Sequence, residues 1–215
     1  QELRMAHQDP SRIAARADLA RLLAACYYEP GPEFAEERVF DVMREAAATV
    51  DPALAEVAER IGRGFTAAGS DELLVDYTRL FLGPVDILAK PYGSVWLDAD
   101  APLMGDSTMA VLQHYEDAGF EVDEGFRDLP DHIAVELEFL YVLLFREAEA
   151  RLRQDAQTLA GLARMRQRFL AEHLGQWAGP FAAAVAAGAQ TSYYRDLVEL
   201  TARFVALEAA RTDAH

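Results

Sequence analysis

Hydrophobic residues recur along most of the chain at the spacing of an α-helix. Leu19, Leu22, Leu23 and Cys26, for example, occupy positions i, i+3, i+4 and i+7, which places them on one helix face. The pattern predicts about nine helices and therefore an all-α fold. The first starts at Pro10, the second covers about 33–48, the third starts at Pro52 and the fourth is capped by Ser70. The fifth runs from Ser107 to Gly119, and the sixth starts at Pro130. The seventh lies around 159–170, the eighth starts at about Pro180 and the ninth lies around 194–207.

Local chemistry supports several of these helix starts. Asp9 and Asp51 each precede a proline, so a capping side chain is followed by a residue suited to the first helical position. The sixth helix is apolar on most of its sides between Ile133 and Leu144. A helix of that kind is typical of the centre of a fold.

The helical pattern is interrupted between Gly83 and Gly105. This stretch contains three prolines and three glycines, which is too punctuated for a helix, and it shows no alternation for more than a short strand. It also carries many apolar residues, Trp96 among them, which argues against disorder. A loop of this length inside a domain is usually functional. We therefore predict one long ordered loop at roughly 83–105, packed on the helices and lining a groove.

Composition limits the class of protein further. The 215 residues suit a single all-helical domain over 1–215, with residues 1–8 frayed. No segment supplies the roughly 18 consecutive apolar residues of a membrane span. The single cysteine, Cys26, is predicted to be a buried core residue, and its isolation fits the reducing cytoplasm. The net charge of −16 repels nucleic acid and anionic membranes, and it would attract a cationic partner.

Asp131 and His132 are the most conspicuous polar pair, and we expect them in the first turn of the sixth helix. Glu136 follows His132 at i+4, on the same helix face, which raises the question of a metal site. A complete site needs more ligands than this spacing offers, so no metal is predicted. Two interpretations remain open. Asp131 and His132 either stabilise the helix start, with His132 bonded to a loop carbonyl, or bind a partner.

Catalytic motifs are missing from the sequence. It contains no G-x-S-x-G elbow, no H-E-x-x-H, and neither of the common glycine-rich phosphate loops. Each polar constellation lacks the partners that catalysis would require. The residues therefore favour a binding protein over an enzyme, with the informative region running from Tyr77 to Glu138.

Five strings, in this order and spacing, resemble one family. They are DYTRLFLGP at 76–84, KPYGSVWLDADAPLMGDST at 90–108, HYEDAGF at 114–120, LPDHIAVELEFL at 129–140 and HLGQWAGPF at 173–181. Together they are similar to the TorD/DmsD/NarJ family of cytoplasmic chaperones for molybdenum-containing redox enzymes, on the TorD/DmsD side of it. The resemblance covers at least residues 73–181.

The resemblance implies a chaperone that binds the twin-arginine signal peptide and the apo-form of a molybdopterin-containing enzyme, holding it for cofactor insertion before export. It implies a cytoplasmic protein, monomeric or a domain-swapped dimer, with no resident cofactor. Some family members are reported to bind guanine nucleotide, for which no phosphate cradle is found here. The alternatives are a NarJ-like assembly chaperone of a non-exported subunit and, in another class, a metal- or GTP-dependent helical hydrolase.

Positions that match the family's peptide-binding surface come from three parts of the chain. Tyr77 and Tyr92 stand where some relatives carry tryptophan. We expect acidic residues, Asp131 with Glu136, to face the two arginines, with His132 fixing the geometry. The complete predicted set is Tyr77, Leu80, Phe81, Pro91, Tyr92, Trp96, Gly105, Asp131, His132 and Glu136.

Overall fold

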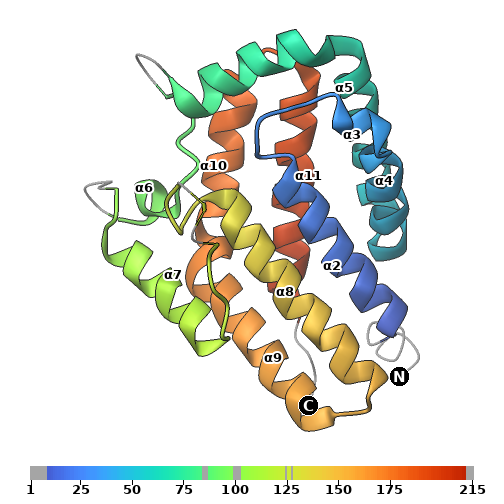
Figure 1. The fold of residues 1–215 in the computed structure, drawn as a ribbon, viewed down its shortest axis with the longest axis vertical. Helices are drawn as coiled ribbons and strands as arrows, with labels where there is room; N and C mark the ends of the chain where they lie inside the picture. Colours follow the sequence, from blue (N-terminus) through green and yellow to red (C-terminus); the bar gives the residue numbers. More distant parts are fainter. Residues whose placement is uncertain (1–8, 84–86, 99–102, 124, 127, 212–215) are drawn as a thin grey trace.

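The protein folds into packed helices, and no strand occurs in the part of the chain that the structure describes (Figure 1). The computed structural model describes residues 9–83, 87–98, 103–123, 125–126 and 128–211. Its helices are α2 (Pro10–Ala25), α3 (Glu33–Glu36), α4 (Val39–Val50), α5 (Pro52–Tyr77), α6 (Gly93–Leu97), α7 (Asp106–Asp117), α8 (Ile133–Leu152), α9 (Ala156–Phe169), α10 (Gly175–Gly188) and α11 (Ser192–Ala210), with π-helical turns η1 (Thr78–Leu82) and η2 (Leu170–Leu174). The predicted all-α single domain is confirmed. The expected frayed residues 1–8 lie outside the described residues.

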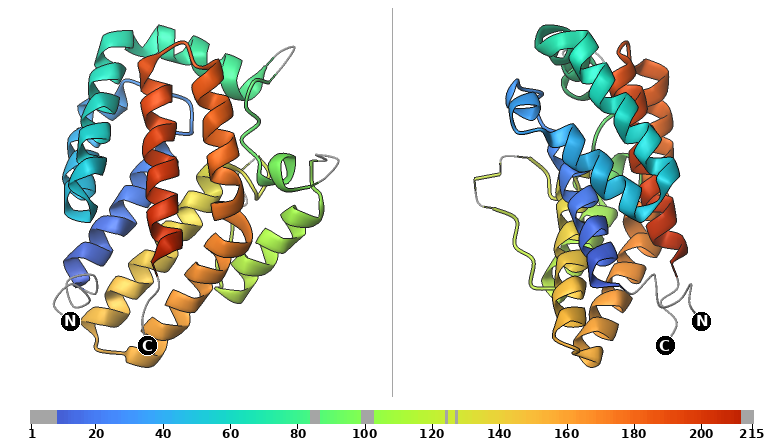
Figure 2. Two further views of the ribbon diagram at one scale, coloured as in Figure 1. Left: turned by 180° about the vertical axis from the view of Figure 1, so that it is seen from behind. Right: turned by 90° about the vertical axis from the view of Figure 1, so that its right-hand side faces the viewer.

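Helix α8 lies at the centre, as its apolar surface predicted. It packs against α2 on one side and α9 on the other, while α10 and α11 lie behind them (Figures 1 and 2). Leu137, Leu140 and Leu144 on α8 are fully buried. Cys26, which follows α2, is a buried free thiol, as predicted, and burial raises its pKa to about 12.

Most helix starts follow the local chemistry. The side chains of Asp9 and Asp51 accept hydrogen bonds from the backbone N–H groups of Ser11 and Ala53, which caps α2 and α5 as expected. The third and fourth predicted helices form the two arms of α5, which bends at Gly69. That glycine has φ 76° and ψ 162°, a backbone conformation that favours glycine.

Two predicted starts are wrong. Helix α8 begins at Ile133 rather than Pro130, and His132 is its N-cap, so Asp131 lies before the first turn. Helix α10 begins at Gly175 and contains Pro180 in its interior. The missing N–H of Pro180 removes one intrahelical hydrogen bond, a loss that the packing of Trp177 and Phe181 in the core can offset.

The described residues that follow Gly83 form an ordered segment that packs on the helices. Ala89 donates its N–H to the carbonyl of Leu80 at 2.9 Å, and both residues are buried. The expectation that this stretch holds no helix is wrong for α6, a five-residue helix. Residues 84–86 and 99–102 of the predicted loop lie outside the described residues.

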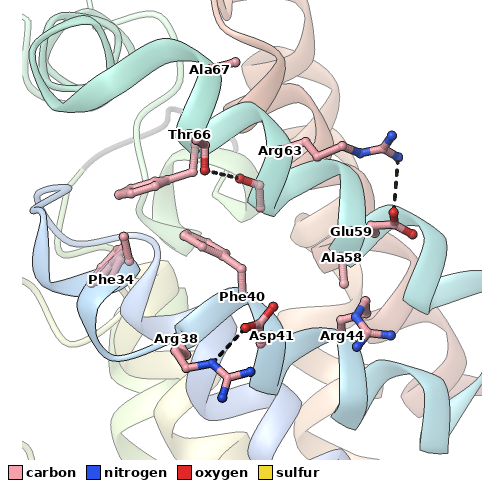
Figure 3. Close-up of a pocket in the computed structure, with 13 residues that line it drawn as sticks. Phe34, Arg38, Phe40, Asp41, Arg44, Ala58, Glu59, Arg63, Thr66 and Ala67 are labelled. Atoms are coloured by element: carbon pink, nitrogen blue, oxygen red, sulfur yellow. Dashed lines mark hydrogen bonds and ion pairs between the residues drawn. The ribbon is translucent and has the colours of Figure 1, made fainter.

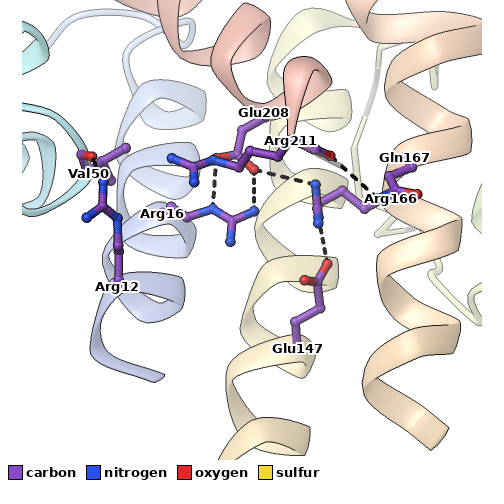
Figure 4. A network of polar contacts seen from close by, with 8 residues as sticks. All are labelled: Arg12, Arg16, Val50, Glu147, Arg166, Gln167, Glu208 and Arg211. Carbon is purple, nitrogen blue, oxygen red and sulfur yellow. Dashed lines mark hydrogen bonds and ion pairs between the residues drawn. The ribbon is translucent and has the colours of Figure 1, made fainter. Parts of the chain in front are cut away.

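A buried network of charges joins four helices at the end of the domain near the C-terminus (Figure 4). Arg16 on α2 donates to both carboxylate oxygens of Glu208 on α11, at 2.8 and 2.6 Å. Arg166 on α9 donates to Glu147 on α8 at 2.7 Å and lies 3.8 Å from Glu208. All four side chains are almost completely buried.

Among the described residues, no helix is long and apolar enough to cross a membrane.

Candidate functional site

Asp131 holds the α6–α7 segment against the start of α8. Its Oδ2 accepts hydrogen bonds from the backbone N–H of Ser94 at 2.8 Å and from the hydroxyl of Thr108 at 3.2 Å. The side chain is fully buried. The carboxylate therefore caps the first turn of α6, not that of α8 as the sequence suggested.

His132 has two different neighbours at its two ring nitrogens. Its Nδ1 accepts the backbone N–H of Ala134 at 3.1 Å, which caps α8 and leaves the proton of the neutral ring on Nε2. That nitrogen lies 4.0 Å from Oδ2 of Asp128. Burial lowers the pKa of His132 to about 4, against the opposing effect of Asp128 and Asp131. The ring is therefore neutral at neutral pH, and its expected bond to a loop carbonyl is replaced by this cap.

Three aromatic rings and the carboxylate of Asp128 lie around His132. The tyrosine ring of Tyr28 stacks on the imidazole at 6.4 Å, Tyr92 meets it edge-on at 5.5 Å, and Phe126 does so at 6.2 Å. We define the aromatic–acidic cluster as Tyr28, Tyr77, Tyr92, Phe126 and His132 together with Glu29, Asp128 and Glu138. It combines residues from the ends of α2 and α5, the loop before α6, and the approach to and first turns of α8.

Two of the three acids of the cluster accept hydrogen bonds from phenols. Tyr28 donates its hydroxyl to Glu138 at 2.8 Å, and Tyr92 donates to Asp128 at 2.6 Å. Burial raises the pKa of both tyrosines, and their bonded carboxylates raise it further. Within the described residues, no lysine or arginine forms an ion pair with an acid of the cluster. The cluster therefore presents negative charge beside partly exposed aromatic faces.

Tyr77 connects the cluster to the core. It is 9% exposed, and its ring contacts Phe81 at a centroid distance of 5.4 Å. Burial raises the pKa of Tyr77, and the charges of Glu29 and Asp128 add to that rise. The phenol of Tyr77 is therefore within electrostatic influence of the acids of the cluster.

Glu136 lies in a separate, fully buried triad. One carboxylate oxygen lies 2.7 Å from His173 Nε2, and the other accepts the indole N–H of Trp177 at 3.0 Å. Burial raises the pKa of Glu136 more strongly than its contacts with His173 and Trp177 lower it. A Cβ atom at Gly93 would lie 3.0–3.1 Å from all three members, so only glycine lets α6 approach them.

The structure thus divides the predicted binding residues into groups. Tyr77, Tyr92 and His132 meet in the aromatic–acidic cluster. Pro91 is buried behind it and accepts the N–H of Ile133 at 2.8 Å. The others lie elsewhere. Leu80 and Phe81 are in the core, Trp96 is in α6, and Gly105 is the N-cap of α7. Asp131 and Glu136 are at the buried contacts described above.

Sequence reasoning missed several partners in both arrangements. Tyr28, Phe126 and Glu138 were not singled out, although each is brought to the cluster. His173 was not predicted as a partner of Glu136, because their separation of 37 residues carries no local signal. Among the described residues, no three His, Cys, Asp or Glu side chains are placed to hold a metal ion.

Comparisons with known proteins converge on one family. Residues 43–183 match the sequence model of the nitrate reductase delta subunit family. A Tat proofreading chaperone DmsD from Salmonella typhi is 31% identical over 114 residues, which cover 53% of this chain and 56% of that protein. A chaperone protein TorD from Vibrio vulnificus is 28% identical over 137 residues, covering 64% of this chain and 62% of that protein. The alignments thus span only about half to two thirds of these relatives.

A solved structure shares the fold. It is the crystal structure of a protein from Archaeoglobus fulgidus described as a redox enzyme maturation protein, with a TM-score of 0.54 and 18% identity. The similarity covers 90% of this chain and 93% of the other. These matches confirm the resemblance to the TorD/DmsD/NarJ family. Both named relatives are described as chaperones.

Proposed function

The chain belongs to the nitrate reductase delta subunit family, and from this premise we propose that it is a chaperone for a molybdopterin-containing redox enzyme. It binds the twin-arginine signal peptide of the apo-enzyme in the cytoplasm and holds the enzyme for cofactor insertion before export. The observation that carries the proposal is the aromatic–acidic cluster, which the family relationship alone would not predict in this form.

The chemistry of the cluster suits a guanidinium group. Arginine binds carboxylates through a planar fork of N–H donors and also stacks on aromatic rings. Asp128 is partly exposed and lies between Tyr92 and His132, so it offers a carboxylate beside aromatic surfaces. A guanidinium there would gain both an ion pair and cation–π contacts.

The rest of the domain supports the same partner. The net charge of −16 draws a cationic peptide toward the surface before contact, and this effect weakens with salt. An apolar stretch would follow the arginines in a twin-arginine signal. Leu82 and Leu88, which are 55% and 43% exposed near the end of η1, supply apolar surface for it.

The experiment is a calorimetric titration with two synthetic peptides. One carries adjacent arginines followed by an apolar stretch, and the other differs only in lysines at the two arginine positions. The proposal predicts tighter binding of the arginine peptide, because only a guanidinium forks onto Asp128 and stacks on the rings. Asp128→Asn should weaken binding by about tenfold, the size of one charge-assisted hydrogen bond.

Asp71→Asn is the matched control. Asp71 is an exposed aspartate on α5, outside the cluster, and its substitution changes the net charge by the same amount. It should alter the affinity by less than about twofold. Equal affinities for the two peptides, or equal losses in the two variants, would contradict arginine recognition by the cluster.

The client itself is tested by co-purification. The tagged protein should retain the apo-form of a molybdopterin enzyme that carries its twin-arginine leader, and release it once cofactor is inserted. Retention of a leaderless subunit instead would favour a chaperone for the assembly of a non-exported subunit.

A further inference from the structure

A concave site lies on the opposite side of α2 from α6 and α7 (Figure 1). A cavity of about 720 Å³ opens between α3, α4 and the first arm of α5. Figure 3 shows Phe40 near the middle of this site, with Arg38, Arg44 and Arg63 around it. We call it the arginine pocket, defined by Phe34, Phe40 and Phe65 together with these three arginines.

Three phenylalanine rings form the floor of the arginine pocket. Phe40 lies 4.8 Å from Phe65 and 6.3 Å from Phe34, centroid to centroid, and Phe34 lies 6.0 Å from Phe65. Phe40 stays partly exposed, so the floor offers apolar surface. A Cβ atom at Gly62 would lie 3.0 Å from Cβ of Phe40, which shows how closely α5 approaches α4 here.

The rim is positively charged in a strongly acidic protein. Arg38 pairs with Asp41 at 2.9 Å, and Arg63 lies 3.8 Å from Glu59. Arg44 has no ion pair with any described residue. Three arginines thus face two carboxylates around the cavity, whereas the whole chain carries a net charge of −16.

Arg38 also has an unusual backbone. Its φ of 55° and ψ of 35° place it in the left-handed region, which non-glycine residues seldom occupy. The conformation is sterically unfavourable for a residue with a Cβ atom, and it lies where α4 starts, at the mouth of the pocket. Strain of this kind is often found where a side chain must be held at a binding surface.

We propose that the arginine pocket docks an acidic peptide segment of a partner protein, in which an apolar side chain lies between carboxylates. The carboxylates would bind the rim arginines through forked hydrogen bonds, and the apolar side chain would cover the exposed face of Phe40. A long polyanion such as nucleic acid does not suit the site, because most of its charges would lie beyond the rim arginines, over a surface of net negative charge. This site has the opposite charge preference from the aromatic–acidic cluster and is independent of the function proposed above.

The test uses a fluorescein-labelled twelve-residue peptide of glutamate and aspartate with one leucine and one phenylalanine at its centre. Anisotropy measures its affinity for the full chain at low salt, and amide NMR shifts map its contacts. We expect binding with the largest shifts in α4 and the first arm of α5. An unlabelled peptide with serines in place of the two apolar residues should compete at least about fivefold less well, because it leaves the floor uncovered.

Charge reversal identifies the pocket. Arg44→Glu should weaken binding about tenfold. Arg164→Glu is the matched control, because Arg164 is an exposed arginine on α9, away from the pocket, and its reversal changes the net charge equally. The control should lose less than about threefold. Affinity of the arginine-bearing peptide for the cluster should be unchanged in Arg44→Glu, which separates this site from the function proposed above.

Three results would overturn the proposal. They are no binding of the acidic peptide at millimolar concentration, equal losses in the two arginine variants, and shifts centred away from α4 and α5. Displacement of the peptide by millimolar inorganic phosphate at constant ionic strength would likewise overturn it, in favour of a site for small phosphate-bearing ligands.

Discussion

The buried charge network at Glu208 and the aromatic–acidic cluster at His132 both contain carboxylates, but these differ in their partners and in their exposure to solvent. In the network, the carboxylate of Glu208 meets arginines from two other helices and is sealed from water. In the cluster, Asp128 and Glu138 accept hydrogen bonds from tyrosine hydroxyls, and Asp128 also accepts the backbone N–H of Leu129. Neither acid pairs with a described lysine or arginine, and both remain partly open to solvent.

The difference distinguishes a charge that stabilises the fold from a charge that is free to bind another molecule. Buried ions must be neutralised within the protein because their desolvation is costly. Burial raises the pKa of Glu208, but Arg16 and Arg166 more than offset this, so its pKa lies below the ordinary value. An exposed acid without a cationic partner can instead recruit one from another molecule.

The comparison is tested most severely at Glu208. Glu208→Gln should lower the free energy of unfolding by about 3–5 kcal/mol, because Arg16 loses its ionic partner inside the core. Urea unfolding followed by circular dichroism measures the change. Glu199→Gln on the same helix is the control, since its pair with Arg60 is partly exposed and is expected to contribute less than about 1 kcal/mol. Similar losses would refute the distinction.

A second prediction concerns pH. The pKa of His132 is lowered to about 4 in the folded protein, while the ordinary value is 6.5. The stability that its neutral form contributes is therefore fully present above pH 6.5 and is lost as pH falls toward 4, by on the order of 2–3 kcal/mol. His132→Asn keeps a capping side chain but removes this titration. Its unfolding free energy should fall less steeply than that of the parent between those pH values.

Tyr28→Phe gives a smaller effect. It removes the hydrogen bond to Glu138 but keeps the ring that stacks on His132, so stability should fall by about 1 kcal/mol. Thermal unfolding detects a change of this size. A loss of unfolding free energy above about 3 kcal/mol would show that the cluster, like the charge network at Glu208, mainly stabilises the fold.

The smallest effect is expected from Asp128→Asn. Because Asp128 is exposed and unpaired with a cation among the described residues, the unfolding free energy should change by less than about 0.5 kcal/mol. The same variant loses affinity for the twin-arginine peptide under the proposed function. Loss of both stability and affinity would make the binding result uninformative about direct contact, and a hydrogen-exchange map would then locate the damage.

The fold could be predicted further than the site. Apolar periodicity reports which face of a helix is buried, so the central place of α8 follows from its sequence. The short helix α6 could not be predicted from its own sequence, because its first turn is capped by Asp131, 37 residues away. Pro180 misled the prediction because proline usually marks a helix start, and here it lies within α10.

The candidate site could be predicted less well than the fold, because its arrangement depends more on tertiary contacts. Tyr77, Tyr92 and His132 were predicted through resemblance, and the structure brings them together. Spacing along one helix suggested that His132 and Glu136 act as a pair, yet one faces the cluster and the other faces His173. A local pattern cannot show which neighbour a side chain will meet across the fold. The binding roles of these residues remain predictions.

The cap that His132 makes on α8 has a thermodynamic consequence. One imidazole contributes both to the start of the central helix and to the wall of the proposed peptide site. A ligand that holds this ring in place also restrains the first amides of α8, and folding of α8 in turn prepares the ring for the ligand. By linkage, any preference of the ligand for the folded chain raises the chain's melting temperature. Occupancy and folding are thus coupled through a single side chain.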